Sequence, residues 1–205
     1  RVKIALGVAR AAAYLHARRD AHGSLSSRCV IVVMREPPPP PEPEMAGCET
    51  EAIAIAMHHH QQALVTEVRV AGYGDRGIAG AGPGPGPETR GTATCTAAAC
   101  DDVYSIGVIM MELVCGTPSL GGTYPQPFTG LVGWVHHVMK DKSLHHHHHH
   151  HHVFCPIDAS LPTSCHGYAL HLLHMAYLCT ARSPAKRPSV HQLVGLLKDL
   201  EHANL

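Results

Sequence analysis

The stretch Asp102-Val-Tyr-Ser-Ile-Gly-Val-Ile-Met-Met-Glu-Leu-Val-Cys-Gly116 decides how the rest of this chain is placed. It is mostly apolar and contains no proline, so it predicts a helix. Asp101 and Asp102 suit the N-cap of that helix, and Gly116 suits its C-terminal end. The longest apolar run, Ile106 to Cys115, is interrupted by Glu112 and is too short to span a bilayer.

The composition indicates one globular domain. The chain has 205 residues, of which 45% are hydrophobic and only 4% are aromatic. Basic and acidic residues balance at 16 each, so charge gives no reason to expect nucleic acid or an anionic membrane as a partner. The chain begins at Arg1 inside a helical pattern, with no signal-peptide pattern, and we expect it to be a fragment or a truncated gene sequence.

The apolar spacing predicts further helices and one hairpin. Val30–Val33 reads as a short buried strand, and Val65–Val70 alternates as a second strand. Pro188 is expected in the first turn of the last helix. The expected helices, besides the one quoted above, are Arg1–His16, Thr129–Asp141, Gly167–Ala181 and Ser189–His202.

Three segments are low in complexity. Glu36–Glu44 is nearly all proline, Gly72–Gly91 is glycine-rich, and His145–His152 is a histidine run. We expect one domain over residues 1–205 with inserts near 35–63 and 143–153. A proline run can bind an SH3- or WW-type groove, but a plain insert is the expected interpretation here.

Eight cysteines are spaced irregularly and none forms a CxxC pair. Cys115 and Cys179 fall inside apolar helical patterns, where a free cysteine behaves as a small hydrophobic residue. We therefore expect no disulfide framework.

Several motifs in order resemble the large C-terminal lobe of plant receptor-like protein kinases of the leucine-rich-repeat type. The quoted helix resembles the buried central helix of that lobe. The other matching motifs are Val2-Lys-Ile-Ala-Leu-Gly-Val-Ala-Arg10, Tyr14-Leu15-His16, Leu131-Val-Gly-Trp-Val135, Leu178-Cys-Thr-Ala181 and Ser183-Pro-Ala-Lys-Arg-Pro-Ser189. The resemblance implies a mainly α fold, a helical bundle with one small β-hairpin, and no small lobe within this chain.

The resemblance places the catalytic loop at His22-Gly-Ser-Leu-Ser-Ser-Arg-Cys29. In an active kinase the loop reads H-R-D-L-K-x-x-N, where the Asp accepts the substrate proton and the Asn binds magnesium. The Asp, Lys and Asn positions correspond here to Ser24, Ser26 and Cys29. A serine hydroxyl is no base near neutral pH, and a thiol is a poor magnesium ligand.

The second metal motif, D-F-G, corresponds to Gly72-Tyr73-Gly74, so the metal-bridging carboxylate is replaced at Gly72. Asp75 lies three positions further on, where the turn geometry does not favour a rescue. No catalytic residue is therefore expected to be intact. ATP and magnesium serve active relatives, and we expect no cofactor for this chain.

The resemblance also implies structural roles. Asp102 is expected to hold the loop backbone through hydrogen bonds, and His22 to pack against Tyr73. Tyr104 and Trp134 are expected in or near the core. The A-P-E element of the activation segment is missing, so Arg187 is expected to be exposed or to pair with a carboxylate other than the family's Glu.

The sequence contains two other candidate sites. His145, His147, His149 and His151 offer weak metal ligands, but nothing in the sequence fixes them, so no specific metal site is expected. Ser24 and His22 suggest a nucleophile and base, but their closeness in sequence argues that they face each other poorly.

The sequence therefore supports a catalytically impaired kinase-like fragment, a pseudokinase, that serves as a protein-interaction scaffold. The alternatives are the tail of an active Ser/Thr receptor-like kinase with a wrongly predicted gene sequence, and a degraded product without function. Protein partners are expected but not identified, and the family's placement implies the cytoplasmic side of a membrane.

Overall fold

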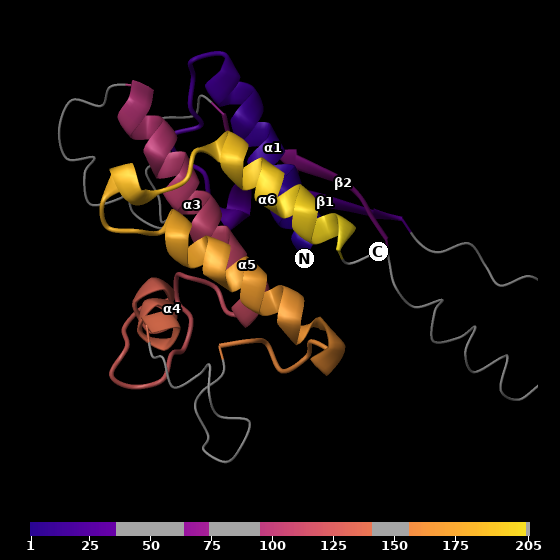
Figure 1. The fold of residues 1–205 in the computed structure, drawn as a ribbon, viewed down its shortest axis with the longest axis vertical. Coiled ribbons are helices and arrows are strands. Elements are labelled where there is room, and N and C mark those ends of the chain that lie inside the picture. Colours follow the sequence, from indigo (N-terminus) through magenta and orange to yellow (C-terminus); the bar gives the residue numbers. More distant parts are fainter. Residues whose placement is uncertain (36–63, 74–94, 141–155, 204–205) are drawn as a thin grey trace, which may run out of the picture.

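The computed structural model describes residues 1–35, 64–73, 95–140 and 156–203, and within them the fold is mainly α-helical with one β-hairpin (Figure 1). This confirms the predicted mainly α architecture. The described α-helices are α1 (Val2–Ala17), α3 (Cys95–Cys115), α4 (Leu131–Lys140), α5 (His166–Cys179) and α6 (Val190–His202). The strands are β1 (Val30–Arg35) and β2 (Leu64–Val70), and short 3-10 turns lie at Ser27–Cys29, Thr163–Cys165 and Pro184–Lys186.

Helix α3 is the centre of the core and contacts α1, α4 and α5. Its Ile106, Met110 and Met111 side chains are completely buried, as expected of a helix that is apolar on several faces. The predicted N-cap was wrong, because the helix begins at Cys95 and places Asp102 in its interior. The alanines before Asp101 have high helix propensity and extend the helix backwards. Its C-terminal end is as predicted, with Gly116 at φ +66°.

The crossing of α3 over α5 depends on a glycine. A Cβ atom at Gly107 would lie 2.8 Å from the Cβ of Cys179 and 2.8 Å from the Cγ2 of Thr180. The two helices therefore approach more closely than a larger residue would allow. Helix α1 makes a similar approach to β2, since a Cβ at Gly7 would lie 2.5 Å from the Cβ of Val68.

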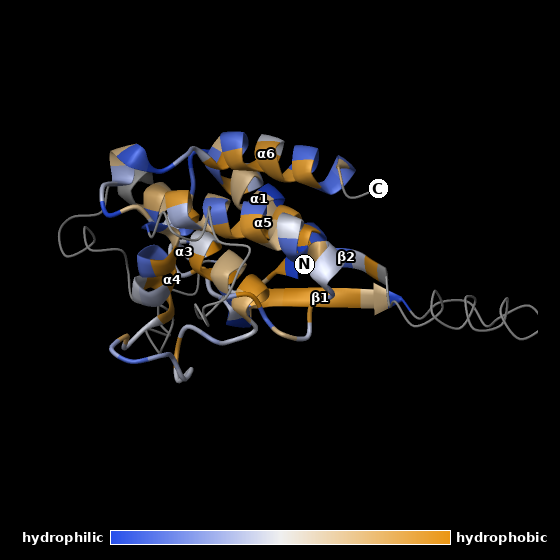
Figure 2. Cartoon of the chain, turned by 60° about the horizontal axis from the view of Figure 1, so that its bottom comes forward, coloured by the Kyte–Doolittle hydropathy of each residue, from blue (hydrophilic) through white to orange (hydrophobic). Residues whose placement is uncertain are grey.

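Helix α6 packs its apolar face against α1, with its polar face outward (Figure 2). Ser189 is its N-cap, and the Ser189 and Gln192 side chains each bond the other's backbone, which forms a capping box. Pro188 therefore precedes the cap, and its predicted place in the first turn was wrong. The buried positions of the helix are Val190, Leu193, Leu197 and Leu200.

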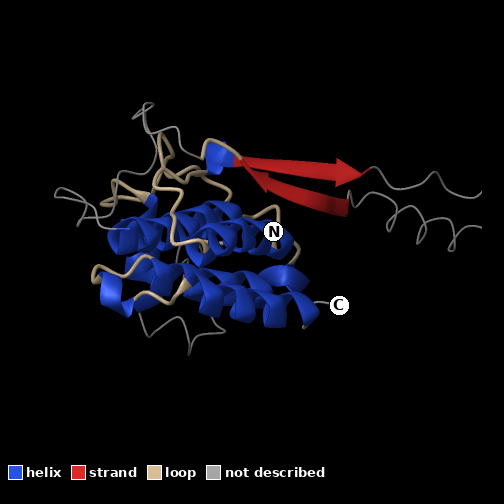
Figure 3. Ribbon diagram, turned by 90° about the horizontal axis from the view of Figure 1, so that it is seen from above, coloured by secondary structure: helices blue, strands red, loops and turns tan. Residues whose placement is uncertain are grey.

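The hairpin extends beyond the helical body (Figure 3), and its strands pair antiparallel from Val30 with Val70 to Arg35 with Leu64. The predicted pairing is confirmed, but the predicted burial of the first strand was wrong. Ile31 is 50% exposed and Val33 is 37% exposed. Among the described elements, the main contact of the sheet is with α1, which leaves these side chains accessible to water.

Helix α4 packs on α3 and α5, and it is slightly shorter than predicted. Trp134 is buried and its ring centroid lies 6.3 Å from that of Tyr124, which confirms its expected core position. Tyr104 is half-buried, also as expected. Among the helices in the described ranges, none combines the length and the apolar character that crossing a bilayer requires.

Candidate functional site

The loop between α1 and β1 is fixed by one buried carboxylate. Asp102 is 1% exposed, and it accepts hydrogen bonds from the backbone N–H of His22 (2.7 Å) and of Gly23 (2.8 Å). His16, in the last turn of α1, donates from Nε2 to the same carboxylate at 3.0 Å. These bonds to the loop backbone are the ones expected of Asp102. They join α1, the loop and α3 at a single residue.

Local sequence explains the course of this loop. Gly23 has φ +75°, a conformation that glycine adopts without strain. Leu25 is 3% exposed and anchors the loop in the core. The N–H of Cys29 then donates to the carbonyl of Ser26 at 3.0 Å, which closes the 3-10 turn that leads into β1.

The loop is joined to the segment that follows β2. His22 is buried and donates from Nε2 to the carbonyl of Ala71 at 3.0 Å. The Ala71 N–H donates to the Cys29 carbonyl at 2.8 Å. The rings of His22 and Tyr73 meet edge to face with centroids 6.4 Å apart, in agreement with the expected packing. Two segments distant in sequence are thus held side by side.

Residues Ser24, Ser26, Cys29 and Gly72 gather at this junction. The Cys29 thiol lies 3.6 Å from the Ser26 hydroxyl and 3.7 Å from the Ser24 carbonyl. A Cβ atom at Gly72 would lie 3.8 Å from the Cys29 sulfur, so side chains at positions 29 and 72 would face each other. This corner contributes hydroxyl and thiol groups and no carboxylate, which is a poor donor set for a hard divalent cation.

The Ser24 hydroxyl lies 3.5 Å from Nδ1 of His22, which is at the outer limit of a hydrogen bond. This long contact is consistent with the expectation that the two groups face each other poorly. Because Nε2 donates to a carbonyl, Nδ1 of the neutral ring is the acceptor. The Ala71 carbonyl orients the His22 ring, but it lacks the negative charge that would stabilise a protonated imidazolium.

Arg187 is buried, so the expectation of an exposed side chain was wrong, while the alternative of a different carboxylate partner is confirmed. Its Nη1 lies 3.9 Å from Oδ1 of Asp101 and donates to the Cys100 carbonyl at 3.0 Å. Its Nε donates to the Ala181 carbonyl at 3.0 Å, and the guanidinium lies 5.0 Å from the ring centroid of Tyr104. Arg187 therefore joins the turn before α6 to α3.

Two contacts of this site are not predicted by the sequence. The sequence pattern places His16 only within a helix, although His16 also completes the hydrogen bonding of Asp102. The Tyr73 hydroxyl donates to the carboxylate of Asp20, which joins the end of the hairpin to the loop after α1. The motif Tyr14-Leu15-His16 was a signal for the first contact, because it ends on a residue able to donate to a carboxylate.

Several predicted residues lie outside the described ranges, namely Gly74, Asp75, the proline run and the histidines at 58–60, 145, 147, 149 and 151. Within those ranges, no group of three or more His, Cys, Asp or Glu side chains gathers as metal ligands would. Among the described cysteines, Cys29, Cys100, Cys165 and Cys179 are free thiols.

The known proteins that are similar to this chain belong to one class. No protein-family profile matches the chain. The leucine-rich repeat receptor-like protein kinase PEPR1 of Arabidopsis thaliana is 30% identical over 103 residues, which covers 49% of this chain and 9% of that protein. The Arabidopsis thaliana leucine-rich repeat receptor protein kinase EMS1 is 35% identical over 101 residues, covering 48% of this chain and 8% of that protein.

A third Arabidopsis thaliana relative is named "Probably inactive leucine-rich repeat receptor-like protein kinase" and is 34% identical over 100 residues, covering 48% of this chain and 11% of that protein. The matched stretch is a small fraction of each relative. The chain is similar to the leucine-rich-repeat receptor-like protein kinases of plants, which confirms the resemblance drawn from its motifs.

Proposed function

We propose that this chain is a pseudokinase fragment: a kinase-like large lobe that does not transfer phosphate and serves as a protein-binding scaffold in receptor-kinase-type signalling, on the cytoplasmic side of a membrane. One observation carries the proposal. Ser24, Ser26, Cys29 and Gly72 converge at one corner, and none of these four residues has a carboxylate, while the buried Asp102 still holds the loop backbone.

The chemistry of that corner supports the loss of activity. Phosphoryl transfer depends on positioning and on metal ions that neutralise the developing charge. Hydroxyl and thiol groups in place of the carboxylate and amide oxygens bind magnesium weakly. General-base assistance contributes about 10²–10⁴ in rate, and Ser24 has no negative charge with which to supply it.

The outer surface of α5 and α6 supports a scaffold role. Leu170, Leu178 and Leu196 are 48%, 38% and 44% exposed. Leu178 and Leu196 line an open groove of about 540 Å³ together with Pro188 and Lys186. Exposed apolar surface with a polar rim is typical of protein-binding sites.

The direct test uses the purified full chain with magnesium and radiolabelled ATP. We expect no transfer to a generic basic protein substrate and no calorimetric heat of nucleotide binding. Transfer that a nucleotide competitor abolishes would overturn the proposal. A chain that shows no cooperative unfolding transition would favour the degraded product instead.

A second experiment tests the geometry of the corner. The double variant Cys29→Asn and Gly72→Asp places two oxygen ligands opposite each other, and aspartate is among the residues that tolerate the φ of +79° at Gly72. We expect the double variant to bind Mn²⁺, measured by loss of the free-ion signal in electron paramagnetic resonance. The parent chain and each single variant should bind less. A folded double variant with no gain would contradict the assigned positions.

The other candidate function is that of a piece of an active receptor-like kinase. It is favoured by the names of the relatives, which describe receptor protein kinases. Sequencing of the transcript separates the two. Codons for the catalytic Asp and Asn at positions 24 and 29 would support the active kinase, whereas serine and cysteine codons would support the pseudokinase.

A further inference from the structure

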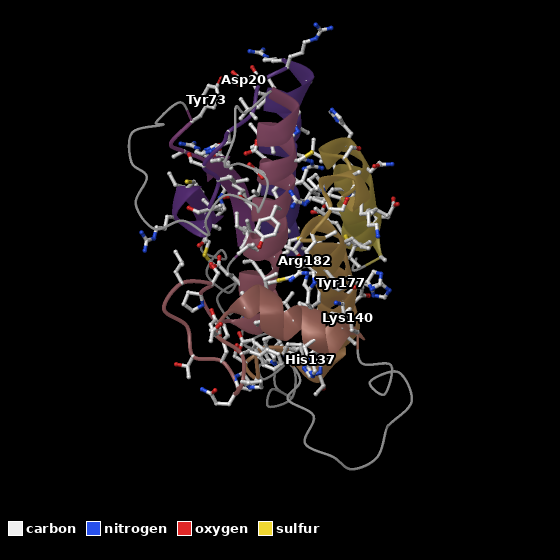
Figure 4. The ribbon with its side chains drawn as sticks, turned by 90° about the vertical axis from the view of Figure 1, so that its left-hand side faces the viewer. Asp20, Tyr73, His137, Lys140, Tyr177 and Arg182 are labelled. Atoms are coloured by element: carbon white, nitrogen blue, oxygen red, sulfur yellow. The ribbon has the colours of Figure 1, made fainter. Side chains whose placement is uncertain are left out.

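A group of basic side chains lies where α4 meets the end of α5, on different elements from the loop around Ser24 and Cys29. His136 and Lys140 come from α4, and Arg182 follows α5. We refer to these three residues as the α4–α5 cationic cluster. Figure 4 shows the side chains of Lys140, Arg182 and Tyr177 close together, and the ring centroid of Tyr177 lies 4.6 Å from that of His136.

The hydrogen bonds of His136 determine its tautomer. Its Nε2 lies 2.7 Å from the Thr180 hydroxyl, and that hydroxyl lies 2.9 Å from the Ala176 carbonyl. The carbonyl only accepts, so the Thr180 hydroxyl donates to it and must accept from His136. The proton of the neutral ring therefore sits on Nε2, and Nδ1 is the atom that gains a proton when the ring becomes charged.

Positive charges surround this ring without a described counter-charge. Burial lowers the pKa of His136, and repulsion from Lys140 and then from Arg182 lowers it further. Neither Lys140 nor Arg182 forms an ion pair with any residue that the structure describes. Lys140 lies in the last turn of α4, where the negative end of the helix dipole partly offsets its charge.

The polar hydrogen donors of the cluster suit a tetrahedral oxyanion. Lys140 and Arg182 are both exposed at the surface. The Tyr177 hydroxyl makes no hydrogen bond within the described ranges and adds a neutral donor. Guanidinium and ammonium groups are the side chains that most often bind phosphate in proteins.

We propose that the α4–α5 cationic cluster binds a phosphate monoester, with Lys140 and Arg182 as the charged ligands and His136 as a third cation that becomes protonated when the anion binds. A dianion beside the ring replaces repulsion by attraction, so it favours the charged imidazole. Binding is therefore coupled to proton uptake at Nδ1, and it strengthens as the pH falls toward the range in which histidine titrates.

The test follows His136 by nuclear magnetic resonance in the full chain. The ring signals are titrated with pH in the presence of inorganic phosphate and, at matched ionic strength, of chloride. We expect phosphate to raise the pKa of His136 relative to chloride, and we expect the ring signals of the exposed His171 on α5 to show no difference between the two anions. An equal response of both histidines, or of neither, would mean an adventitious ion only and would overturn the proposal.

Variants identify the ligands. Lys140→Gln and Arg182→Gln should each weaken phosphate binding about fivefold, as expected for the loss of one exposed ion pair. Lys198→Gln, on the exposed face of α6, is the matched control and should leave binding unchanged. Asp141 follows Lys140 outside the described residues, and Asp141→Asn should leave binding equal or tighter. Weaker binding in that variant would contradict the proposed ligand set.

Two phosphate sources share this chemistry, and peptides separate them. A phosphoserine peptide that binds more tightly than inorganic phosphate, while its unphosphorylated form does not bind, assigns the site to modified protein partners. Equal affinity for the peptide and inorganic phosphate assigns it to the free anion.

Discussion

At the scale of single residues, Asp102 carries the largest concentration of polar contacts around the loop. Its two oxygens receive three donors, and its side chain is almost inaccessible to water. A buried charge is tolerated only when its hydrogen bonds are complete. The position of the loop therefore depends on this carboxylate.

The variant Asp102→Asn tests that dependence. Its amide group offers one acceptor and one donor, so at least one backbone N–H of the loop would face another donor. We expect the free energy of unfolding in urea to fall by about 2–4 kcal/mol. Asp199→Asn on the exposed face of α6 is the control, with an expected change within about 0.5 kcal/mol. Equal losses for both variants would contradict the role given to Asp102.

Asp158 provides a test by pH. Hydrogen bonds from the backbone and side chain of Ser160 and from Arg1 lower the pKa of Asp158 from 3.8 to about 2. A lowered carboxyl pKa stabilises the folded state above pH 3.8, and this contribution is lost as the pH falls toward 2. We expect Asp158→Asn to reduce the slope of stability against pH in that window, as measured by urea unfolding. Identical slopes for variant and parent would contradict this account.

At this scale, a contact was predictable from the sequence where a recognisable motif contained the residue that makes it. The contact of Asp102 with the loop was expected from the resemblance. The pairing of Arg187 with Asp101 was not identified, because it depends on α3 beginning at Cys95 and so turning Asp101 toward the end of α5. The local sequence does not show that α3 begins at Cys95, so it does not show which way Asp101 faces.

At the scale of elements, the crossing of α3 and α5 predicts that an alanine at Gly107 destabilises the protein, whereas helix propensity alone predicts that it stabilises the protein. Alanine is favoured over glycine in helices by about 1 kcal/mol. A methyl group at Gly107 would nevertheless lie 2.8 Å from atoms of Cys179 and Thr180. We expect Gly107→Ala to destabilise the protein by about 1–3 kcal/mol, because the helices must separate.

Gly195 on α6 is the matched control, because a Cβ there would have no neighbour within 4 Å. Gly195→Ala should raise stability by up to about 1 kcal/mol in the same urea experiment. A stabilising effect of both substitutions would show that the α3–α5 approach is looser than described.

The helices were predictable from the sequence because apolar spacing and caps define them locally. The errors arose where tertiary context decides. Alanines before Asp101 extended α3, and the apolar side chains of Ile31 and Val33 stayed exposed because α1 covers only the other face of the hairpin. A run of apolar residues does not reveal whether a covering element exists.

At the scale of the whole molecule, α1, α3, α4, α5 and α6 share one continuous core in the described residues. Cys179 lies within it, and burial raises the pKa of its thiol to about 12. Since the thiolate is the reactive form, this thiol should react with iodoacetamide only after the core opens. Cys29 is partly exposed and should react in the native state.

Mass spectrometry of alkylated peptides over a urea series measures this difference. We expect modification of Cys179 to follow the global unfolding curve and that of Cys29 to precede it. Native-state modification of Cys179 at the rate of Cys29 would contradict a single cooperative core.

The hairpin has a consequence for the behaviour of this protein in concentrated solution. Within the described residues β1 and β2 pair only with each other, so each strand leaves one edge of backbone donors and acceptors open. Ile31 and Met34 lie on that ribbon with their apolar surface toward water. Open strand edges of this kind recruit further strands, although the register shift between Val33 and Met34 and the exposed Glu67–Arg69 pair are features that oppose such pairing. Aggregation of this chain is therefore expected to begin at the hairpin, from the folded state, before any helix has melted.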